Sequence, residues 1–385
     1  MPETDDLRAE YEELRRQFRE LHPDELKSGR WFAGFVRFAL ESHSRRVDAN
    51  YIFKKYPGAG PANHAKKAIS IASRTAAIAG GISAAAVTGL EFSIPASGGL
   101  DLPVAVPLIG ASIIGDVALT SRIQLRTTYD LSMIHGGPLA LDDIEDCFLI
   151  FAAALGVQVA EKAGDAAKAI GPKIVAYNVR KLLRSGLRRA LVKLVSKIGG
   201  TVIGRKLTEQ ALMRLLVPGV SIPLSATANF LFTRKFLLIS NTRMKRRGAV
   251  VRPILQLRRA EPNVDPTLAV KSLIAVMEAA KRPDGWEEDQ LNALRATQSA
   301  LGLTDEHVQA LEPWFDRTPA DVVPEAKALS QESSLLLRSY LTVGAALGEK
   351  VNDGRYAEAI ATILPRGPQA DETAGAIAEK RRLLE

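Results

Sequence analysis

The chain has 385 residues, of which 46% are hydrophobic and 24% are charged, and its net charge is +8. This ordinary globular composition excludes a wholly disordered chain, and the length allows two or three domains. The single cysteine, Cys147, excludes an internal disulfide framework and a multi-cysteine metal site. Because the opening segment is charged, unlike a signal or transit peptide, we expect a cytoplasmic protein.

The first predicted helix covers residues 4–25. Its apolar residues follow a heptad-like spacing, but only about two heptads are present. Because this is too few for a stable coiled coil, we expect the helix to dock on the chain's own core. Helical spacing continues over residues 29–56, and a loop rich in proline and glycine follows at 56–61. The heptad-like apolar positions of the first helix are Leu7, Tyr11, Leu14, Phe18 and Leu21.

Two stretches farther along the chain are nearly free of charge. Residues 75–121 hold three charged residues, seven glycines and three prolines, and residues 215–233 hold no charge at all. Both fall short of the roughly 20 strongly apolar residues that cross a bilayer. We interpret them as buried or re-entrant helical hairpins with peripheral membrane contact. Small residues such as Gly80 and Gly81 are expected to let helices pack closely.

The charge is divided unevenly along the chain. Residues 1–160 carry a net charge of −3, residues 161–260 carry +19, and residues 261–385 carry −8. A block as basic as the middle one attracts polyanions, which are anionic lipid or nucleic acid. The plain alternative is a solvated helical surface that faces the acidic block.

Amphipathic helices are predicted over residues 172–216, and a second basic cluster lies in 242–259. Such helices suit an anionic membrane surface. Nucleic acid competes as a ligand, but the block has few aromatic residues to stack on bases and no recognised binding motif. An ordinary surface helix with its apolar stripe inward is the third interpretation. The predicted lipid-binding residues are Lys181, Arg184, Arg188, Arg189, Lys193, Lys197, Arg243, Lys245, Arg246 and Arg247.

The composition changes again near residue 262. Helical periods return, and Pro262 and Pro266 bracket a plausible linker, so we place a boundary at 255–265. No segment shows the alternation of paired strands, and the predicted fold is therefore all-α. The expected organisation is N-terminal amphipathic helices in 1–60, a Gly/Ala-rich helical core domain with basic helices in 61–258, and a small acidic helical bundle in 262–385.

Known catalytic motifs are not found in the sequence. It lacks the phosphate-binding, dinucleotide-binding, zinc-protease and nucleophile-elbow patterns, and its five histidines are scattered. We therefore favour a protein that is not an enzyme.

Acidic residues in apolar surroundings need partners, because a buried carboxylate must be paired or protonated. Asp101 and Asp116 are such residues. We predict that Asp116 is buried and pairs with Arg122 or Arg126, with Arg234 as a further possible partner. A salt bridge that fixes the helix register is favoured over a polar pocket.

Residues 68–250 resemble the bacterial EcsC family in two blocks. The first block holds Asp116, Gln124-Leu125-Arg126 and His135-Gly136. The second holds Pro218-Gly219-Val220 and the run from Asn229 to Arg234. The family usually has tyrosine at the position of His135. The resemblance implies a helical, membrane-associated bacterial protein, and it adds His135 and Asn229 to the candidate polar core residues.

Residues 265–365 resemble the TerB-like helical fold. The match lies in the apolar run of residues 273–281 and in the Asp-Gly-Trp-Glu-Glu-Asp segment of 284–289, with Pro283 as an extra residue. Acidic turns of that family have been proposed to hold a cation. Asp284, Glu287 and Glu288 could offer oxygen ligands to Ca²⁺. The simpler interpretation is a turn followed by an acidic helix start.

These observations predict a membrane-associated bacterial protein at the inner face of the membrane. Its basic face would bind anionic lipid or a membrane partner, and its TerB-like part would be a regulatory or protein-binding module. One alternative is an enzyme or lipid-handling protein with a polar core pocket around Asp116 and Arg126. Another is nucleic-acid binding through residues 161–260. The oligomeric state is left open.

Overall fold

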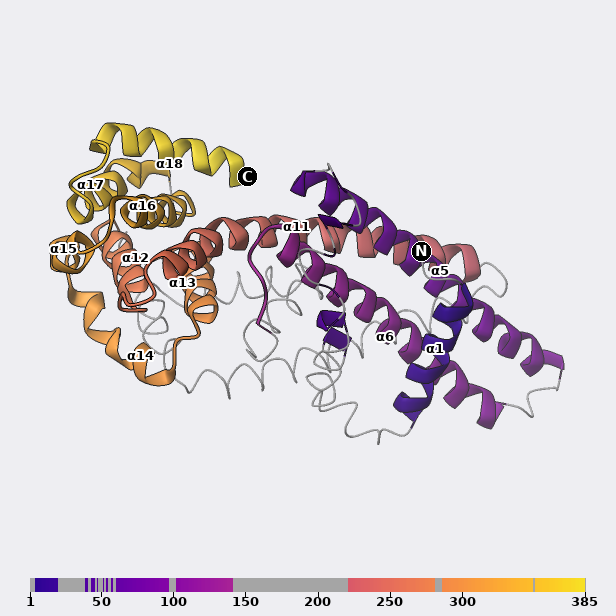
Figure 1. Cartoon of the computed structure of the whole chain (residues 1–385). Coiled ribbons are helices and arrows are strands. Elements are labelled where there is room, and N and C mark those ends of the chain that lie inside the picture. The colour runs from indigo at the N-terminus through magenta and orange to yellow at the C-terminus, as the bar shows by residue number, and fades with distance from the viewer. Residues whose placement is uncertain are drawn as a thin grey trace. The chain divides into compact units, whose positions relative to one another are not determined.

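The computed structural model contains only helices as regular structure among the residues that it describes (Figure 1). The all-α prediction is therefore confirmed. Eleven α-helices and two short 3-10 helices are present in this part of the chain. The described residues are 4–19, 39–40, 43–45, 47, 51, 53–54, 57, 60–96, 102–140, 221–280, 286–348 and 350–384.

The chain divides into two compact units. One comprises Met1–Leu131, Cys147–Val157 and Leu191–Asn241. The other comprises Ser132–Asp146, Gln158–Ala190 and Thr242–Glu385. Helices α6 (Leu102–Ile134) and α11 (Ser221–Ala260) each contribute residues to both units.

The first unit contains α1 (Thr4–Arg19), α5 (Pro61–Ala96) and the first parts of α6 and α11. Helix α1 packs against α5, and Leu7 and Tyr11 are buried. Docking of the first helix on the chain's own core is thus confirmed for these two positions. Leu21 and the end of the predicted helix lie outside the described residues.

Helix α5 begins where the predicted loop ends. Pro61 occupies its first position, where the missing N–H of proline costs nothing, and the carbonyl oxygen of Gly60 accepts the first helical hydrogen bonds. The inner face is built mainly from alanines such as Ala72, Ala76 and Ala79. The expected close contact at Gly81 is wrong, because a β-carbon there would meet no atom within 4 Å. Gly81 lies on the half-buried side of the helix.

The helices of the second unit that follow α11 surround one central helix, α12 (Leu268–Ala279). Nine of its twelve residues are buried, and it packs against α13, α15, α16 and α17. The remaining helices are α13 (Glu288–Leu301), α14 (Asp305–Ala310), α15 (Pro319–Lys327), α16 (Gln331–Ala346), α17 (Asp353–Ile363) and α18 (Ala370–Leu384), with 3-10 turns at Glu312–Asp316 and Lys350–Asn352.

The boundary predicted at 255–265 falls partly inside α11, which ends at Ala260. Val250, Ile254 and Leu257, near the end of α11, belong to the same hydrophobic core as α12 to α18. Apolar residues continue at helical spacing to this point, so the last turns of α11 pack in the C-terminal core. The irregular connection to α12 covers only residues 261–267.

Candidate functional site

Helix α11 holds nine basic residues and no acidic residue in its forty positions. The last turn carries Arg258 and Arg259, where positive charge interacts favourably with the helix dipole. A helix of this length with one sign of charge has no internal ion pairs at i, i+4 spacing. Its cations must therefore be solvated, paired with other elements, or used to bind an anion.

An exposed stripe on the first part of α11 combines cations with large apolar side chains. Leu231 is 59% exposed and Leu238 is 50% exposed, and Arg234 and Lys235 between them are also exposed. These four residues follow one another at i, i+3, i+4 and i+7, which is one helical face. Among the described residues, no acidic side chain forms an ion pair with Arg234 or Lys235. We call these four residues the α11 stripe.

The opposite face of the same segment is polar as well as apolar. The side-chain amide of Asn229 donates to Thr120 Oγ1 at 3.3 Å, and that of Gln124 donates to Thr233 Oγ1 at 3.0 Å. Both pairs are 109 residues apart in sequence. The constant offset means that α6 and α11 run parallel and in register here. Asn229 is thus a buried polar core residue, as predicted.

Arg122 and Arg126 share a partner that the sequence analysis did not consider. Both guanidinium groups contact Glu10 of α1, at 2.7 and 3.2 Å. Burial lowers the pKa of Arg122, an effect that Glu10 opposes and Arg126 reinforces. The backbone of Asp116 lies in α6, but its side chain and the whole of Asp101 lie outside the described part of the structure. The pairing of Asp116 therefore stays a prediction.

Arg234 is wrong as a polar core candidate, because its side chain is exposed on α11. His135 contributes to its surroundings through the backbone. It stands in the turn that ends α6, where Gly136 has a φ of +74°, a left-handed conformation that glycine adopts without strain. The carbonyl oxygen of His135 accepts a hydrogen bond from Arg252 at 2.8 Å. The His135-Gly136 block is thus a helix ending.

The four predicted lipid-binding residues of the 242–259 cluster are paired or half-buried, whereas Arg258 and Arg259 at the end of the same cluster are exposed. Arg247 is only 6% exposed, and it donates to the carbonyl oxygens of Gly137 and Pro138. A lipid-binding role for Arg247 is therefore wrong for this conformation. Arg246 forms an ion pair of 2.5 Å with Asp289. Arg243 and Lys245 are half-buried, and Lys181 to Lys197 lie outside the described residues.

The acidic turn predicted for Ca²⁺ is only partly described, because Asp284 and the side chain of Glu288 lie outside the described part of the structure. Glu287 is exposed at the start of α13, and its backbone N–H donates to Gln290 Oε1 at 3.2 Å. This contact fits the simpler interpretation, a capped helix start. Within the described ranges, no three acidic, histidine or cysteine residues are grouped to hold a metal.

A histidine–aspartate contact in the first unit is a further feature that the sequence does not predict. His43 Nε2 lies 2.7 Å from Asp130 Oδ1, and the ring of Tyr129 meets His43 edge-on. Burial raises the pKa of Tyr129, and the charge of Asp130 raises it further. The two partners are 87 residues apart in sequence, so no local pattern indicated the contact.

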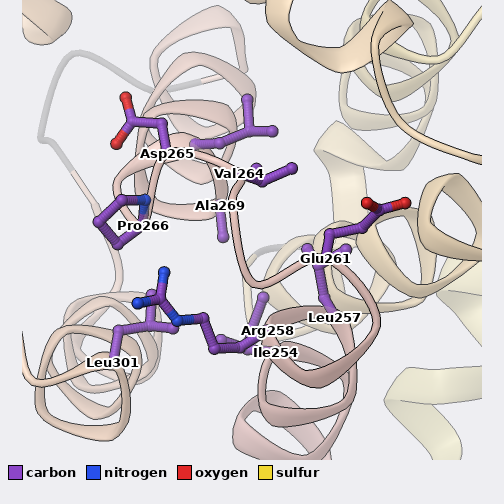
Figure 2. A pocket seen from close by; sticks show the side chains of 10 residues that line it. Ile254, Leu257, Arg258, Glu261, Val264, Asp265, Pro266, Ala269 and Leu301 are labelled. Carbon is purple, nitrogen blue, oxygen red and sulfur yellow. The ribbon is translucent and has the colours of Figure 1, made fainter.

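A small cavity lies in the second unit where α11 turns toward α12 (Figure 2). Its free volume of about 20 Å³ holds about one water molecule, which is too little for a substrate. It is distinct from the polar core pocket considered around Asp116. Its walls are formed by Ile254, Leu257, Arg258, Glu261, Val264, Asp265, Pro266, Leu268, Ala269 and Leu301.

One described helix segment could cross a membrane by length and composition. The segment is Pro61–Ala85, with 25 residues. An 18-residue window within it has a mean hydropathy of 1.2, and half of that window is buried inside the protein. The core helices of soluble proteins share these properties.

No protein-family model, curated protein or solved structure matches the chain. The resemblances to the EcsC family and to the TerB-like fold therefore stay predictions.

Proposed function

We propose that the protein binds the surface of anionic membranes through α11 and that binding, not catalysis, is its function. The observation that carries this proposal is the charge of α11. This helix holds nine basic residues and no acidic one, and two of its cations, Arg234 and Lys235, are exposed. A lysine or arginine near an anionic leaflet contributes about 1 kcal/mol. These two residues together would strengthen binding by a factor of about 30.

Nucleic acid is the competing ligand for a basic helix. Phosphate contacts alone would use the same cations, but they would leave the exposed leucines in water. Leu231 and Leu238 flank the cations of the α11 stripe, and this favours lipid. The EcsC-like assignment, a cytoplasmic location at the inner face of the membrane, and a regulatory or partner-binding role for the TerB-like part belong to the same proposal and have only sequence support.

Flotation with vesicles tests the proposal. The full chain should float with phosphatidylcholine vesicles that contain phosphatidylserine, should not float with phosphatidylcholine alone, and should be released by added salt. Arg234→Gln/Lys235→Gln should lose at least tenfold in affinity, on the order set by two surface charges. The matched control is Lys66→Gln/Arg74→Gln, which removes the same charge from two exposed positions of α5.

Two results would count against the proposal. If the full chain does not bind phosphatidylserine vesicles at physiological salt, anionic lipid is not its ligand. If both double variants lose the same affinity, only net charge matters and α11 is not the site. A parallel titration with duplex DNA distinguishes the competing ligand, because tighter and steeply salt-dependent DNA binding would favour nucleic acid.

A further inference from the structure

The α11 stripe places two exposed leucines where a soluble surface would usually carry polar residues. Single exposed apolar residues are common and need no explanation. Here Leu231 and Leu238 each expose at least half of their surface. They lie on one face, two turns apart, about 10 Å along the helix axis. Leaving this area in water costs free energy in proportion to its size.

The cations between the leucines indicate what could cover them. Arg234 and Lys235 have long apolar stems that can lie along a hydrocarbon surface while their charges stay in water. A helix with leucines on one face and cations at their level suits the boundary between headgroups and acyl chains. An apolar protein groove would bury the leucines but would have to leave both cations paired or solvated at its rim.

A comparison within the chain supports this assignment. Leu335 of α16 is 56% exposed, as much as the leucines of the stripe. One turn before it stands Glu332, which is exposed and acidic and would be repelled by an anionic surface. Exposure alone therefore does not distinguish the stripe; the combination of exposed leucines with cations does.

We propose that Leu231 and Leu238 insert into the acyl boundary of an anionic bilayer while Arg234 and Lys235 bind lipid phosphates. This inference rests on the proposed function and deepens it, because it names the inserting residues and the side of α11 that faces the membrane. The occupant of the stripe is a bilayer with anionic headgroups. A second copy of the chain is an outcome of the test.

Depth-dependent quenching tests insertion in the full chain. Leu231→Trp and Leu238→Trp each add one tryptophan to the three of the natural sequence. With phosphatidylserine vesicles that carry brominated acyl chains, the added fluorescence should be quenched and shifted to shorter wavelength. Leu335→Trp is the matched control, and its added fluorescence should stay unquenched.

Truncation of the leucines separates insertion from charge attraction. Leu231→Ala/Leu238→Ala should bind these vesicles about tenfold more weakly, with unchanged helix content and unfolding temperature, and Leu335→Ala should bind like the natural protein. If the double alanine variant binds normally and Arg234→Gln/Lys235→Gln does not, insertion is wrong and the proposed function stands. If the natural protein does not bind at all, both fail. If instead the natural protein is a dimer without lipid and the double alanine variant is a monomer, a second copy occupies the stripe and the inference is overturned.

Discussion

Arg381 shows how one side chain can complete the end of a helix and join two others. It donates two hydrogen bonds to the carboxylate of Asp353, at 2.7 and 2.8 Å. It also donates to the carbonyl oxygens of Ala346 and Gly348, at the C-terminal end of α16, where the backbone has no intrahelical partners. Both charged side chains are 14% exposed. The bidentate contact therefore ties α18 to α16 and α17 in a largely dry setting.

Replacing Asp353 by alanine should destabilise the protein by about 3 kcal/mol, because Arg381 would keep a buried charge without its carboxylate. Urea unfolding followed by circular dichroism measures the loss. Asp321→Ala serves as a control, since this carboxylate accepts hydrogen bonds from Thr318 at an exposed helix start, and its loss should be clearly smaller. Equal losses in the two variants would show that the Arg381 contact adds nothing beyond an ordinary cap.

Asp265 makes stability depend on pH in the acid range. Its burial alone would raise its pKa, but the hydrogen bonds from Lys271 and Thr267 outweigh burial, and the pKa lies below the ordinary 3.8. A depressed pKa stabilises the folded state above the ordinary value, and this contribution is lost as the pH falls through the folded-state pKa. The pKa of Lys271 is raised, because the hydrogen bonds to Asp265 and Glu325 and the charges of these two carboxylates outweigh burial. The contribution of Lys271 to stability is therefore lost only at alkaline pH.

Asp265→Asn should therefore reduce stability at neutral pH and change it much less in acid, once the pH has fallen below the lowered pKa of the natural carboxylate. The measurement is the free energy of unfolding at several pH values in the natural protein and the variant. Parallel curves for the two proteins, with no convergence in acid, would contradict the prediction.

At the scale of elements, a close contact between α11 and the turn after α6 involves two glycines that no sequence motif indicates. The backbone of Gly137, just after α6, lies against Gly248 of α11, and a β-carbon on Gly137 would come within 2.8 Å of the Gly248 nitrogen. A β-carbon on Gly248 would overlap the carbonyl oxygen of His135. Arg247 and Arg252 bind carbonyl oxygens of the same turn. Glycine is thus required here for close approach.

Gly248→Ala should cost about 1–3 kcal/mol, because the added methyl group must push the turn away from α11. Gly81→Ala should instead stabilise the protein by roughly 0.5–1 kcal/mol, since that helical position has open space and alanine is the better helix former. Thermal unfolding of both variants provides the comparison. A stabilised Gly248→Ala would mean that the contact is looser than described.

The sequence could predict the kind of element better than the partners of its side chains. Apolar periods of 3.6 residues indicate helices, and a helix without acidic residues is visible in any printed sequence. The pairing of Arg126 with Glu10 could not be predicted, because 116 residues separate them and only tertiary packing brings them together. A local pattern instead pairs each arginine with the nearest acid in apolar surroundings, which is Asp116. The prediction for Arg247 is wrong because spacing does not reveal which cations meet carbonyl groups.

At the scale of the whole molecule, the basic and acidic blocks of the sequence meet within the second unit. Arg246 of the basic cluster pairs with Asp289 of α13, and it also donates to the carbonyl oxygen of Leu384 in α18. Both side chains of the pair are partly exposed, so competing anions can reach them. The acidic C-terminal residues thus hold one cation that the sequence had assigned to lipid.

If Arg246 contributes to lipid binding when released, Asp289→Asn should bind phosphatidylserine vesicles more tightly than the natural protein. Asp371→Asn makes the same change of net charge at an exposed position in the first turn of α18. We expect Asp289→Asn to gain severalfold more affinity than this control, as one added surface cation would give. Equal gains would mean that Asp289 acts only through net charge.

The polar side chains between α6 and α11 also restrict the register in which these two helices can pack. Thr120, Gln124 and Thr128 follow one another by about one turn, as do Asn229 and Thr233 on the facing helix. In the observed register the buried hydroxyl of Thr128 has no hydrogen-bond partner in the described part of the chain. A slide of one turn, 5.4 Å, would set Gln124 against Asn229 and Thr128 against Thr233, so polar groups would meet again, whereas half a turn would leave the buried amides unsatisfied. Polar pairing therefore disfavours registers of α6 and α11 that differ from the observed one by a fraction of a turn.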